Sequence, residues 1–508
     1  MPASIVVFFV ALPLCLGIAL ASGAPLFSGL IAGIVGGIVV GAMSGSQIGV
    51  SGPAAGLAAI VATAIITLGS YENFLMAVVL GGVIQLLFGV LKLGIIGYFF
   101  PSSVIKGMLT GIGIFIILKE IPYFFGYDTP MDGGTTFTNV ANSFTNISTG
   151  PLVIGIISLV ILIIWSQVLA KQGKIFQLIQ GPLVAVAVGI GFYFFTQSSE
   201  TMALTQSQLV NVPVPGDIES FFGQFTLPNF DQIFKPEIWI VAFTIALVAS
   251  LETLLCVEAT DKLDPEKRVT PTNRELLAQG TGNIVSGMIG GLPITQVIVR
   301  SSANIQSGGK TKASAIIHGF FLLIAVMLIP VLLNKIPLSV LAAILFVVGY
   351  KLAKPSLFKK MFELGWKQWV PFLTTICGIV FIDLLKGLGL GLAVGIVVTL
   401  IKSYQNSHFL HIVDKSNGVH KVKMTLAEEV TFFNKGAILR ELDALEENSY
   451  LELDVRNTRY LDNDIIEILE DFQEKAHNKN ITISLVSERG TVENPDSYIE
   501  FFKLKPTV

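Results

Sequence analysis

The sequence predicts a polytopic α-helical membrane protein with a soluble α/β domain at its C-terminal end. Three observations support this. The 508 residues are 52% hydrophobic and only 14% charged, whereas soluble domains average about 25% charged residues. Long apolar stretches recur up to about residue 404. Residues 405–508 are polar and carry a net charge of −7, against +4 for residues 1–404. The composition argues against a soluble enzyme and excludes a disordered chain, and nothing in it suggests a nucleic-acid partner.

Fourteen apolar stretches can be marked as membrane spans, each of which requires about 20 mostly apolar residues. Some of them are short or interrupted by glycine and proline. We therefore expect seven plus seven spans in residues 1–404, followed by the soluble domain in 405–508. The predicted spans are 3–21, 26–43, 52–68, 73–91, 98–119, 151–169, 177–196, 236–257, 273–290, 295–306, 312–333, 336–353, 367–382 and 387–404.

The positions of lysine and arginine predict the orientation. Residues 120–149 and 196–234 contain neither, so both are expected outside, because cytoplasmic loops are rich in these residues. The loop 170–176 between them carries Lys171 and Lys174 and is expected inside. The alternation predicts cytoplasmic termini in the cell (inner) membrane. No cleavable signal peptide is expected, since no basic segment precedes the first apolar stretch.

Two short segments interrupt the helical pattern. In residues 49–56, Ser51 is a suitable N-cap and Pro53 suits a first helical turn, so an extended stretch is expected to become a helix partway across the membrane. Residues 290–295 precede a short helix in the same manner. The breaks fall in the third and tenth spans, at matching places in the two halves, which points to a transporter site. Helix N-termini there would favour an anion, although each break alone could be a packing kink.

Two charged residues lie in these apolar surroundings. Arg300 follows the second break, and Glu252 lies in the eighth span, where we expect it to be the one carboxylate deep in the membrane. Charges in such places are costly and are functional candidates by default. Arg300 could bind an anion, attract it without contact, or pair with Glu252. Glu252 could carry a proton, hold sodium, or balance Arg300.

The remaining polar and sulfur-containing candidates have simpler interpretations. Gln85 is expected to join helices rather than bind a ligand. Cys15, Cys256 and Cys377 lie in apolar stretches and are odd in number, so we expect small packing residues and no disulfide framework.

Four segments occur together: residues 81–94 (GGVIQLLFGVLKLG), 100–113, 11–14 (ALPL) and 304–311 (NIQSGGKT). In this combination, with a soluble tail behind it, the chain resembles the sulfate permease (SulP) family of anion transporters over nearly its whole length. The resemblance implies a fourteen-span inverted 7+7 fold of core and gate domains. It also implies elevator-type alternating access and, usually, a homodimer.

The resemblance further implies an anion pocket between spans 3 and 10 that is closed by span 1. Arg300 matches the family's common arginine, and Glu252 matches its span-8 acid, the candidate for coupling to H⁺ or Na⁺. No other cofactor and no metal are implied. The pocket residues carried over by position are Leu14, Ile18, Ser51, Gly52, Pro53, Ala54, Ala55, Val299, Arg300 and Ser301.

The sequence departs from the family pattern at two points. Leu14 stands where many members have Gln or Glu, which puts proton coupling through that position in doubt. Sodium-coupled bicarbonate members tend to lack the arginine, so the presence of Arg300 weakens the sodium interpretation.

The tail has a pattern of its own. Apolar residues alternate in 451–455, which predicts a strand, form one face of a helix in 465–472, and fill a second strand in 481–486. Strand, helix and strand indicate an α/β layer, and behind a transporter this resembles a STAS domain, which could bind cytosolic partners. Phosphorylatable members carry Asp-Ser-Ser where residues 462–464 read Asp-Asn-Asp, so phosphoregulation there is expected to be lost.

The predicted function is secondary active transport of small inorganic anions of the sulfate, bicarbonate or chloride class across the lipid bilayer. Alternatives are an uncoupled anion channel or anion sensor, and a sodium-coupled bicarbonate or proton-coupled dicarboxylate carrier of the same fold. A nucleobase permease shares the fold, but the tail and Arg300 argue against it.

Overall fold

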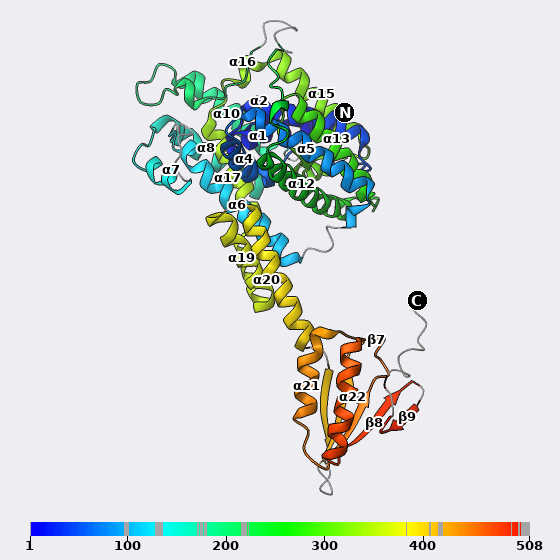
Figure 1. Ribbon diagram of the computed structural model, residues 1–508. Helices are drawn as coiled ribbons and strands as arrows, with labels where there is room; N and C mark the ends of the chain where they lie inside the picture. Colours follow the sequence, from blue (N-terminus) through cyan, green and yellow to red (C-terminus); the bar gives the residue numbers. More distant parts are fainter. Residues whose placement is uncertain are drawn as a thin grey trace. The chain divides into compact units, whose positions relative to one another are not determined.

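The computed structural model divides into two compact units, Met1–Leu392 and Ala393–Val508, which Figure 1 colours along the sequence. The division falls inside helix α20 (Leu384–Gln405), whose C-terminal end lies at the expected domain boundary. The structure describes residues 2–95, 101–127, 136–169, 172, 176, 180–214, 221, 223–382, 384–405, 408–414, 420–488, 490–495 and 498. Lys171 and Lys174, on which part of the predicted orientation depends, lie outside these residues, as does Phe100 of the family motif.

Every one of the fourteen predicted stretches contains a helix. Six of the described helices are long and apolar enough to cross a membrane. Among the described residues of this unit, four helical elements fall outside the predicted spans: the amphipathic α18, the short α7, and the single 3-10 turns η5 and η6. The helices of the first unit are α1 (Pro2–Ala21), α2 (Leu26–Val35), η1 (Gly36–Val40), α3 (Gly41–Met43), η2 (Ala55–Leu57), α4 (Ala58–Leu68), α5 (Tyr71–Val90), α6 (Ser102–Phe124), α7 (Thr136–Ser143), α8 (Thr149–Gln167), α10 (Gly181–Thr196), η5 (Gln206–Gln208), η6 (Phe230–Gln232), α12 (Pro236–Leu263), α13 (Thr272–Met288), α14 (Ile298–Gln306), α15 (Ala313–Leu328), α16 (Pro330–Leu333), α17 (Leu338–Leu352), α18 (Pro355–Glu363), α19 (Trp366–Phe381) and α20.

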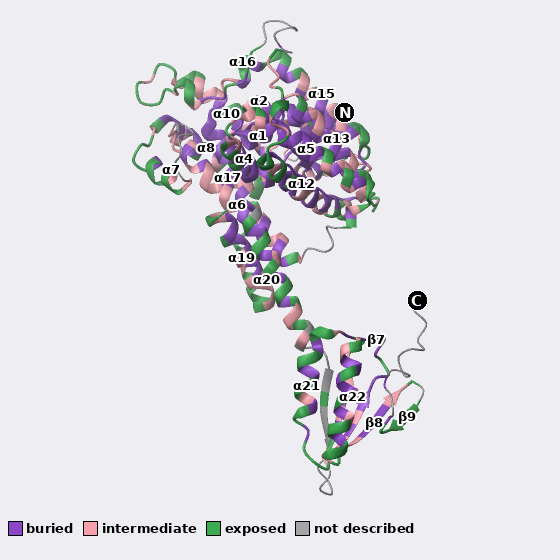
Figure 2. Cartoon of the chain, viewed as in Figure 1, coloured by how far each residue is buried: buried purple, intermediate pink, exposed green. Residues whose placement is uncertain are grey.

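The helices of this unit pack in two groups. In the first group, α5 packs against α12 and α13, and α1 packs against α2, α14 and α15. In the second group, α6 packs against α17 and α19, and α8 packs against α10 and α17. Helix α1 also contacts α10 and α17, so it lies where the groups meet. Figure 2 shows the buried residues gathered along α1, α2 and α5, as expected for helices enclosed by other helices.

Glycine and buried amides join the helices of the first group. A Cβ at Gly82 of α5 would lie 2.7 Å from the carbonyl oxygen of Gly280 in α13, and a Cβ at Gly280 would lie 2.8 Å from that of Gly82. Only glycine permits this approach. Gln85 donates a hydrogen bond to Ser250 and accepts one from Asn283. The prediction that Gln85 joins helices is therefore confirmed.

The tail unit forms a five-stranded sheet in the order β3-β4-β6-β8-β9. Strands β4, β6 and β8 are parallel, and the two edge strands are antiparallel. The predicted strand, helix and strand are confirmed as β6, α22 and β8. The elements are β3 (His408–Asp414), β4 (Lys421–Leu426), β5 (Glu429–Val430), η8 (Phe432–Asn434), α21 (Lys435–Asp443), β6 (Tyr450–Asp454), β7 (Tyr460–Leu461), α22 (Asn463–Asn478), β8 (Thr482–Ser487) and β9 (Gly490–Glu493).

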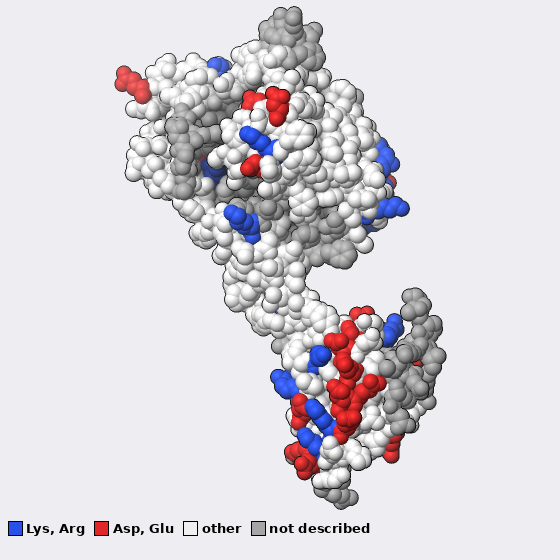
Figure 3. Space-filling view, in the orientation of Figure 1, with Lys and Arg blue, Asp and Glu red and all other residues white. Residues whose placement is uncertain are grey.

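The core of the tail is built from the apolar sides of these elements. Leu453 of β6, Leu485 of β8 and Ile465 of α22 are fully buried. Figure 3 shows charged side chains crowded on the visible surface of the tail and sparse on that of the helical unit. The charge division seen in the sequence is therefore a division between an aqueous surface and an apolar one.

Candidate functional site

Two short, buried strands pair with each other inside the helical unit. We call this strand pair, together with the beginnings of the two helices that follow it, the crossing. Strand β1 (Ser51–Pro53) pairs antiparallel with β2 (Ile294–Gln296), and Gly52 lies opposite Thr295. The pairing satisfies backbone polar groups that would otherwise be exposed to an apolar environment. Each strand is followed by a helix, η2 and α4 in one case and α14 in the other. The two predicted breaks are thus confirmed as extended segments that turn into half-helices and meet each other.

The expectation that Ser51 caps a helix is wrong. Ser51 lies in the strand, and its hydroxyl accepts a hydrogen bond from Gln279 Nε2 at 2.8 Å. Residue 51 pairs in a strand instead of capping a helix because strand pairing provides hydrogen-bond partners for backbone N–H and C=O groups of this segment directly. Neither η2 nor α14 is capped by the side chain of its own N-cap residue, so the N–H groups of both first turns are available to acceptors from elsewhere in the protein or from a ligand. Two such termini together favour a negative charge between them.

Glu252 and Cys256 approach these two termini from α12. The backbone N–H of Gly56, in η2, donates a hydrogen bond to the Glu252 carboxylate, and a Cβ at Gly56 would collide with both carboxylate oxygens. The backbone N–H of Ile298, the first residue of α14, donates to the Cys256 thiol. One face of α12 therefore contacts the beginnings of both half-helices.

Cys256 is the residue at the crossing that sequence reasoning missed, because it was interpreted as a packing residue. The available signal was its spacing of four residues from Glu252, which places both side chains on one face of a helix.

Arg300 lies in the first turn of α14, and its side chain is fully buried. Its Nη2 is 3.3 Å from Cys15 Sγ, while Nε and Nη1 have no hydrogen-bond partner among the described residues. A Cβ at Gly52 would collide with Nη1, so the guanidinium lies directly against β1. No ion pair joins it to Glu252 or to another described acid. The alternative that Arg300 pairs with Glu252 is therefore wrong, since each of the two faces a different part of the crossing.

The predicted pocket residues divide by solvent access. Ala55 and Val299 are half-buried, as are Glu252 and Cys256. The others are buried: Leu14, Ile18, Ser51, Gly52, Pro53, Ala54, Arg300 and Ser301. Solvent thus reaches the crossing at the beginnings of the half-helices rather than along the strands.

The Ser301 hydroxyl is used to hold the crossing together. It accepts a hydrogen bond from the Val50 N–H at 3.0 Å and donates one to the Val297 carbonyl oxygen at 2.9 Å. The Ser51 hydroxyl is also engaged, by Gln279. Ser301 therefore links the two half-sites, whereas Ser51 joins β1 to α13, and both hydroxyls have hydrogen-bond partners within the protein.

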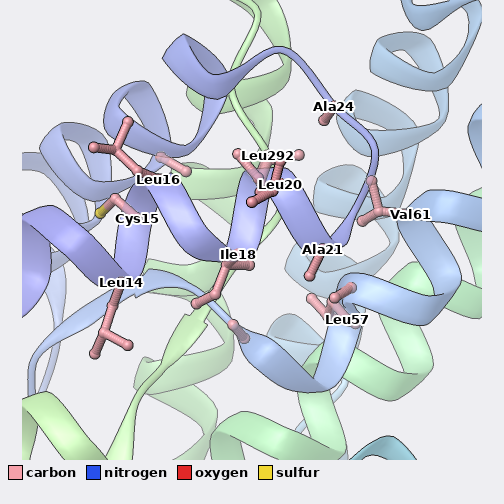
Figure 4. Close-up of a cluster of buried hydrophobic side chains, with 14 of the residues drawn as sticks. Leu14, Cys15, Leu16, Ile18, Leu20, Ala21, Ala24, Leu57, Val61 and Leu292 are labelled. Atoms are coloured by element: carbon pink, nitrogen blue, oxygen red, sulfur yellow. The ribbon is translucent and has the colours of Figure 1, made fainter. Parts of the chain in front are cut away.

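Helix α1 covers the crossing with Leu14 and Ile18. Figure 4 shows these side chains extending from the same side of α1, and Cys15, the neighbour of Arg300, extending from another. Leu14 and Val299 line one cavity of about 260 Å³. The structure thus brings together the predicted residues of spans 1 and 10 at a space large enough for a small anion.

From the sequence we expect Glu252 to be the one carboxylate deep among the apolar helices. The structure shows two others among the helices that it describes. Glu120 near the end of α6 is fully buried, and neither of its oxygens has a partner among the described residues. Glu275 of α13 is also fully buried and accepts hydrogen bonds from Ser44 and Gln279. Glu120 was missed because it lies where a loop was expected, whereas α6 continues to Phe124.

Comparison with known proteins identifies related transporters. The model of the sulfate permease family matches residues 1–375. The bicarbonate transporter BicA of Picosynechococcus sp. is 27% identical over 450 residues, which cover 84% of this chain and 76% of BicA. The chloride anion exchanger of Mus musculus is 27% identical over 366 residues, 69% of this chain and 46% of the exchanger. The solved structure of SLC26A9 matches 95% of this chain and 84% of its own, with a TM-score of 0.77 and 16% identity, a likeness of fold.

Proposed function

The chain belongs to the sulfate permease family of anion transporters, and from this premise we propose that it is a secondary active carrier of small inorganic anions. The anion is held at the crossing of β1 and β2, between the beginnings of η2–α4 and α14. The observation that carries this proposal is the convergence of two uncapped helix N-termini beside a buried arginine that has no acidic partner among the described residues.

Arg300 attracts the anion electrostatically, through the electric field of its positive charge. Its guanidinium lies behind β1, against Gly52 and Cys15, and not at the accessible end of the crossing. An unpaired buried cation is costly, so an anion at the helix termini lowers the free energy of the loaded site. Ala55 and Val299, in the first turns of η2 and α14, are half-buried, and we assign their backbone N–H groups as donors to the anion.

Glu252 couples transport to protons. Its carboxylate accepts from Gly56 and so occupies the same helix terminus that attracts the anion. Two negative charges at one terminus repel each other, and protonation of Glu252 relieves this repulsion. Loading of the anion and of a proton are therefore favoured together. Sodium binding at Glu252 is the competing outcome and is separated by the test given in the Discussion.

The two helix groups support a proposal of alternating access. We assign the first group, which carries the crossing, as the core and the second group as the gate. The core moves against the gate in an elevator-type motion, and α1 lines the border. The finer architecture belongs to this proposal: fourteen spans in an inverted 7+7 arrangement, cytoplasmic termini in the inner membrane, a homodimer, and a STAS domain formed by the tail.

The test uses the full chain in liposomes. Labelled sulfate and labelled chloride are measured separately in counterflow, with unlabelled bicarbonate as a competitor in each case, because BicA, a bicarbonate transporter, matches 84% of the chain. A carrier gives saturable counterflow that is competed by its preferred anion. Flux that neither saturates nor shows counterflow would indicate a channel. Labelled bicarbonate is measured in the same way, and no flux of any of the three labels would reject transport of this class.

A further inference from the structure

A second cavity adjoins the one that reaches the candidate site. The smaller cavity, of about 260 Å³, extends from Leu14 and Val299 to residues of α8, α10 and α17. The larger, of about 650 Å³, lies between α8 and α17. Three residues line both cavities: Ser166, Val347 and Lys351. The two cavities are therefore neighbours along these three residues, of which Lys351, near the end of α17, is solvent-exposed.

The charge along this route has one sign. Lys351 is the only charged residue among the described residues that line the smaller cavity, and Lys354 is the only one that the larger cavity adds. Neither lining contains an acid. The rest of the smaller cavity is mostly aliphatic, so its low polarity screens a lysine charge less than bulk water would. Among the described lining residues, Lys351 is thus the one cation of the smaller cavity, the cavity that reaches the first turn of α14 at Val299.

We propose that Lys351 guides the anion into and out of the site, on the face of the transporter where these two cavities lie. This inference rests on the proposed function, because it assigns a route to the anion that the crossing holds. Lys351 attracts the anion into the smaller cavity, where Val299 marks the beginning of α14. A lysine suits this task because its ammonium is a mobile, strongly hydrated point charge, which does not clamp an oxyanion as a guanidinium fork would.

The charge of residue 351 sets the apparent affinity (the KM) for an anion that enters from this face. Lys351→Gln should raise the KM for the transported anion by about three- to tenfold while kcat changes little, since steering acts on encounter rather than on translocation. Lys351→Glu should raise it further, and Lys351→Arg should stay within about twofold of the parent. The KM of the parent should rise with ionic strength, set with potassium gluconate, more steeply than that of Lys351→Gln.

The matched control is Lys359→Gln on α18. Lys359 is 81% exposed and lines neither cavity, so it tests the general loss of one positive charge near this face. Its KM should remain within about twofold of the parent. Thermal unfolding of each purified variant separates a steering role from a folding defect, because a structural role would lower stability without changing the ionic-strength dependence.

A charge-restoration experiment completes the test. Lys351→Cys in liposomes is treated with a membrane-impermeant trimethylammonium or sulfonate methanethiosulfonate reagent, and sulfate and chloride counterflow are measured as before. The parent receives the same treatments because Cys377 is exposed and Cys256 is half-buried. The cationic adduct should recover affinity and the anionic adduct should reduce it. Equal responses to both reagents in an active protein would overturn the role of Lys351 alone, whereas absence of counterflow in the untreated parent would overturn the proposed function and this route with it.

Discussion

The carboxylate of Glu252 contacts the backbone of Gly56 so closely that no side chain fits between them. Glu252 belongs to the eighth predicted span, and Gly56 to the beginning of the half-helix in the third. The contact links the candidate coupling residue directly to one of the two termini at which we propose that the anion is held. A change at Glu252 would therefore act on the proposed binding site without an intermediate residue.

Gly56→Ala should disrupt this contact. The added Cβ collides with both oxygens of Glu252, and overpacking of this kind costs about 1–3 kcal/mol. We expect counterflow to fall about five- to hundredfold in a protein that still purifies as a folded species. Gly191→Ala on α10 is the control, because a Cβ there has no neighbour within 4 Å. Equal activity of the two variants would show that the contact has no role in transport.

Arg300→Ala should reduce anion counterflow at least about tenfold, the equivalent of about 1.4 kcal/mol of binding, with expression near normal. Arg300→Lys should recover part of the activity, since it keeps the charge but not the planar guanidinium beside Cys15. Counterflow and size-exclusion profiles are measured on the same preparations. Full activity of a folded Arg300→Ala protein would contradict the electrostatic role that we assign to this residue.

Glu252→Gln should remove the dependence of uptake on an inward proton gradient while exchange continues. The amide resembles the protonated carboxyl in shape and does not titrate. Uptake is measured with pH and sodium gradients imposed separately. Loss of sodium stimulation at constant pH would instead assign Glu252 to sodium, and a variant that behaves as the parent under every condition would show that Glu252 is structural.

The tail should show a pH-dependent contribution from Asp454. Hydrogen bonds and charge from Arg456 and Lys423 hold the pKa of Asp454 well below its usual range. A carboxyl whose folded-state pKa is lowered stabilises the fold above its unfolded pKa of about 4, and this contribution is lost as the pH falls toward the folded value. Asp454→Asn should therefore destabilise the tail by about 1–3 kcal/mol at pH 7, and progressively less at lower pH.

Urea unfolding of residues 405–508 from pH 7 down to pH 3 measures this difference. Asp443→Asn is the control, since its ion pair with Lys475 is about half exposed on both sides and contributes little. A constant difference between Asp454→Asn and the parent across the range would show that packing, not charge, accounts for the loss.

Deletion of residues 409–508 should leave the order of anion preference unchanged but lower the rate, stability or trafficking of the transporter. The tail has a separate hydrophobic core, whereas every residue of the crossing belongs to the helical unit. Competition assays on the truncated and full chains make the comparison. A changed order of preference would show that the tail contributes to the site.

The apolar helices can be predicted well from the sequence because stretches of such apolar composition are unfavourable in contact with water. The sequence also locates the crossing, since glycine and proline at 49–56 and 290–295 are incompatible with an unbroken helix. It does not show that Ser51 pairs in a strand with Gln296, because that depends on a segment about 240 residues away in the chain. The other omissions have separate causes: Glu120 lies beyond the predicted end of its span, whereas Cys256 and Lys351 acquire their neighbours only when helices distant in sequence pack together.

Separation of Arg300 from Glu252 has an electrical consequence. With both ionised, the empty core carries no net charge from this pair. If Glu252 takes up one proton with each anion, as proposed, addition of a monovalent anion leaves this sum at zero, so the pair adds no voltage dependence to the empty or the loaded movement. A divalent anion with one proton leaves one negative charge, on which the membrane potential acts with about 2.3 kcal/mol per 100 mV if the charge crosses the whole field. Under the proposed coupling, the membrane potential would therefore leave carriage of monovalent anions unaffected and would drive or oppose carriage of divalent anions according to its direction.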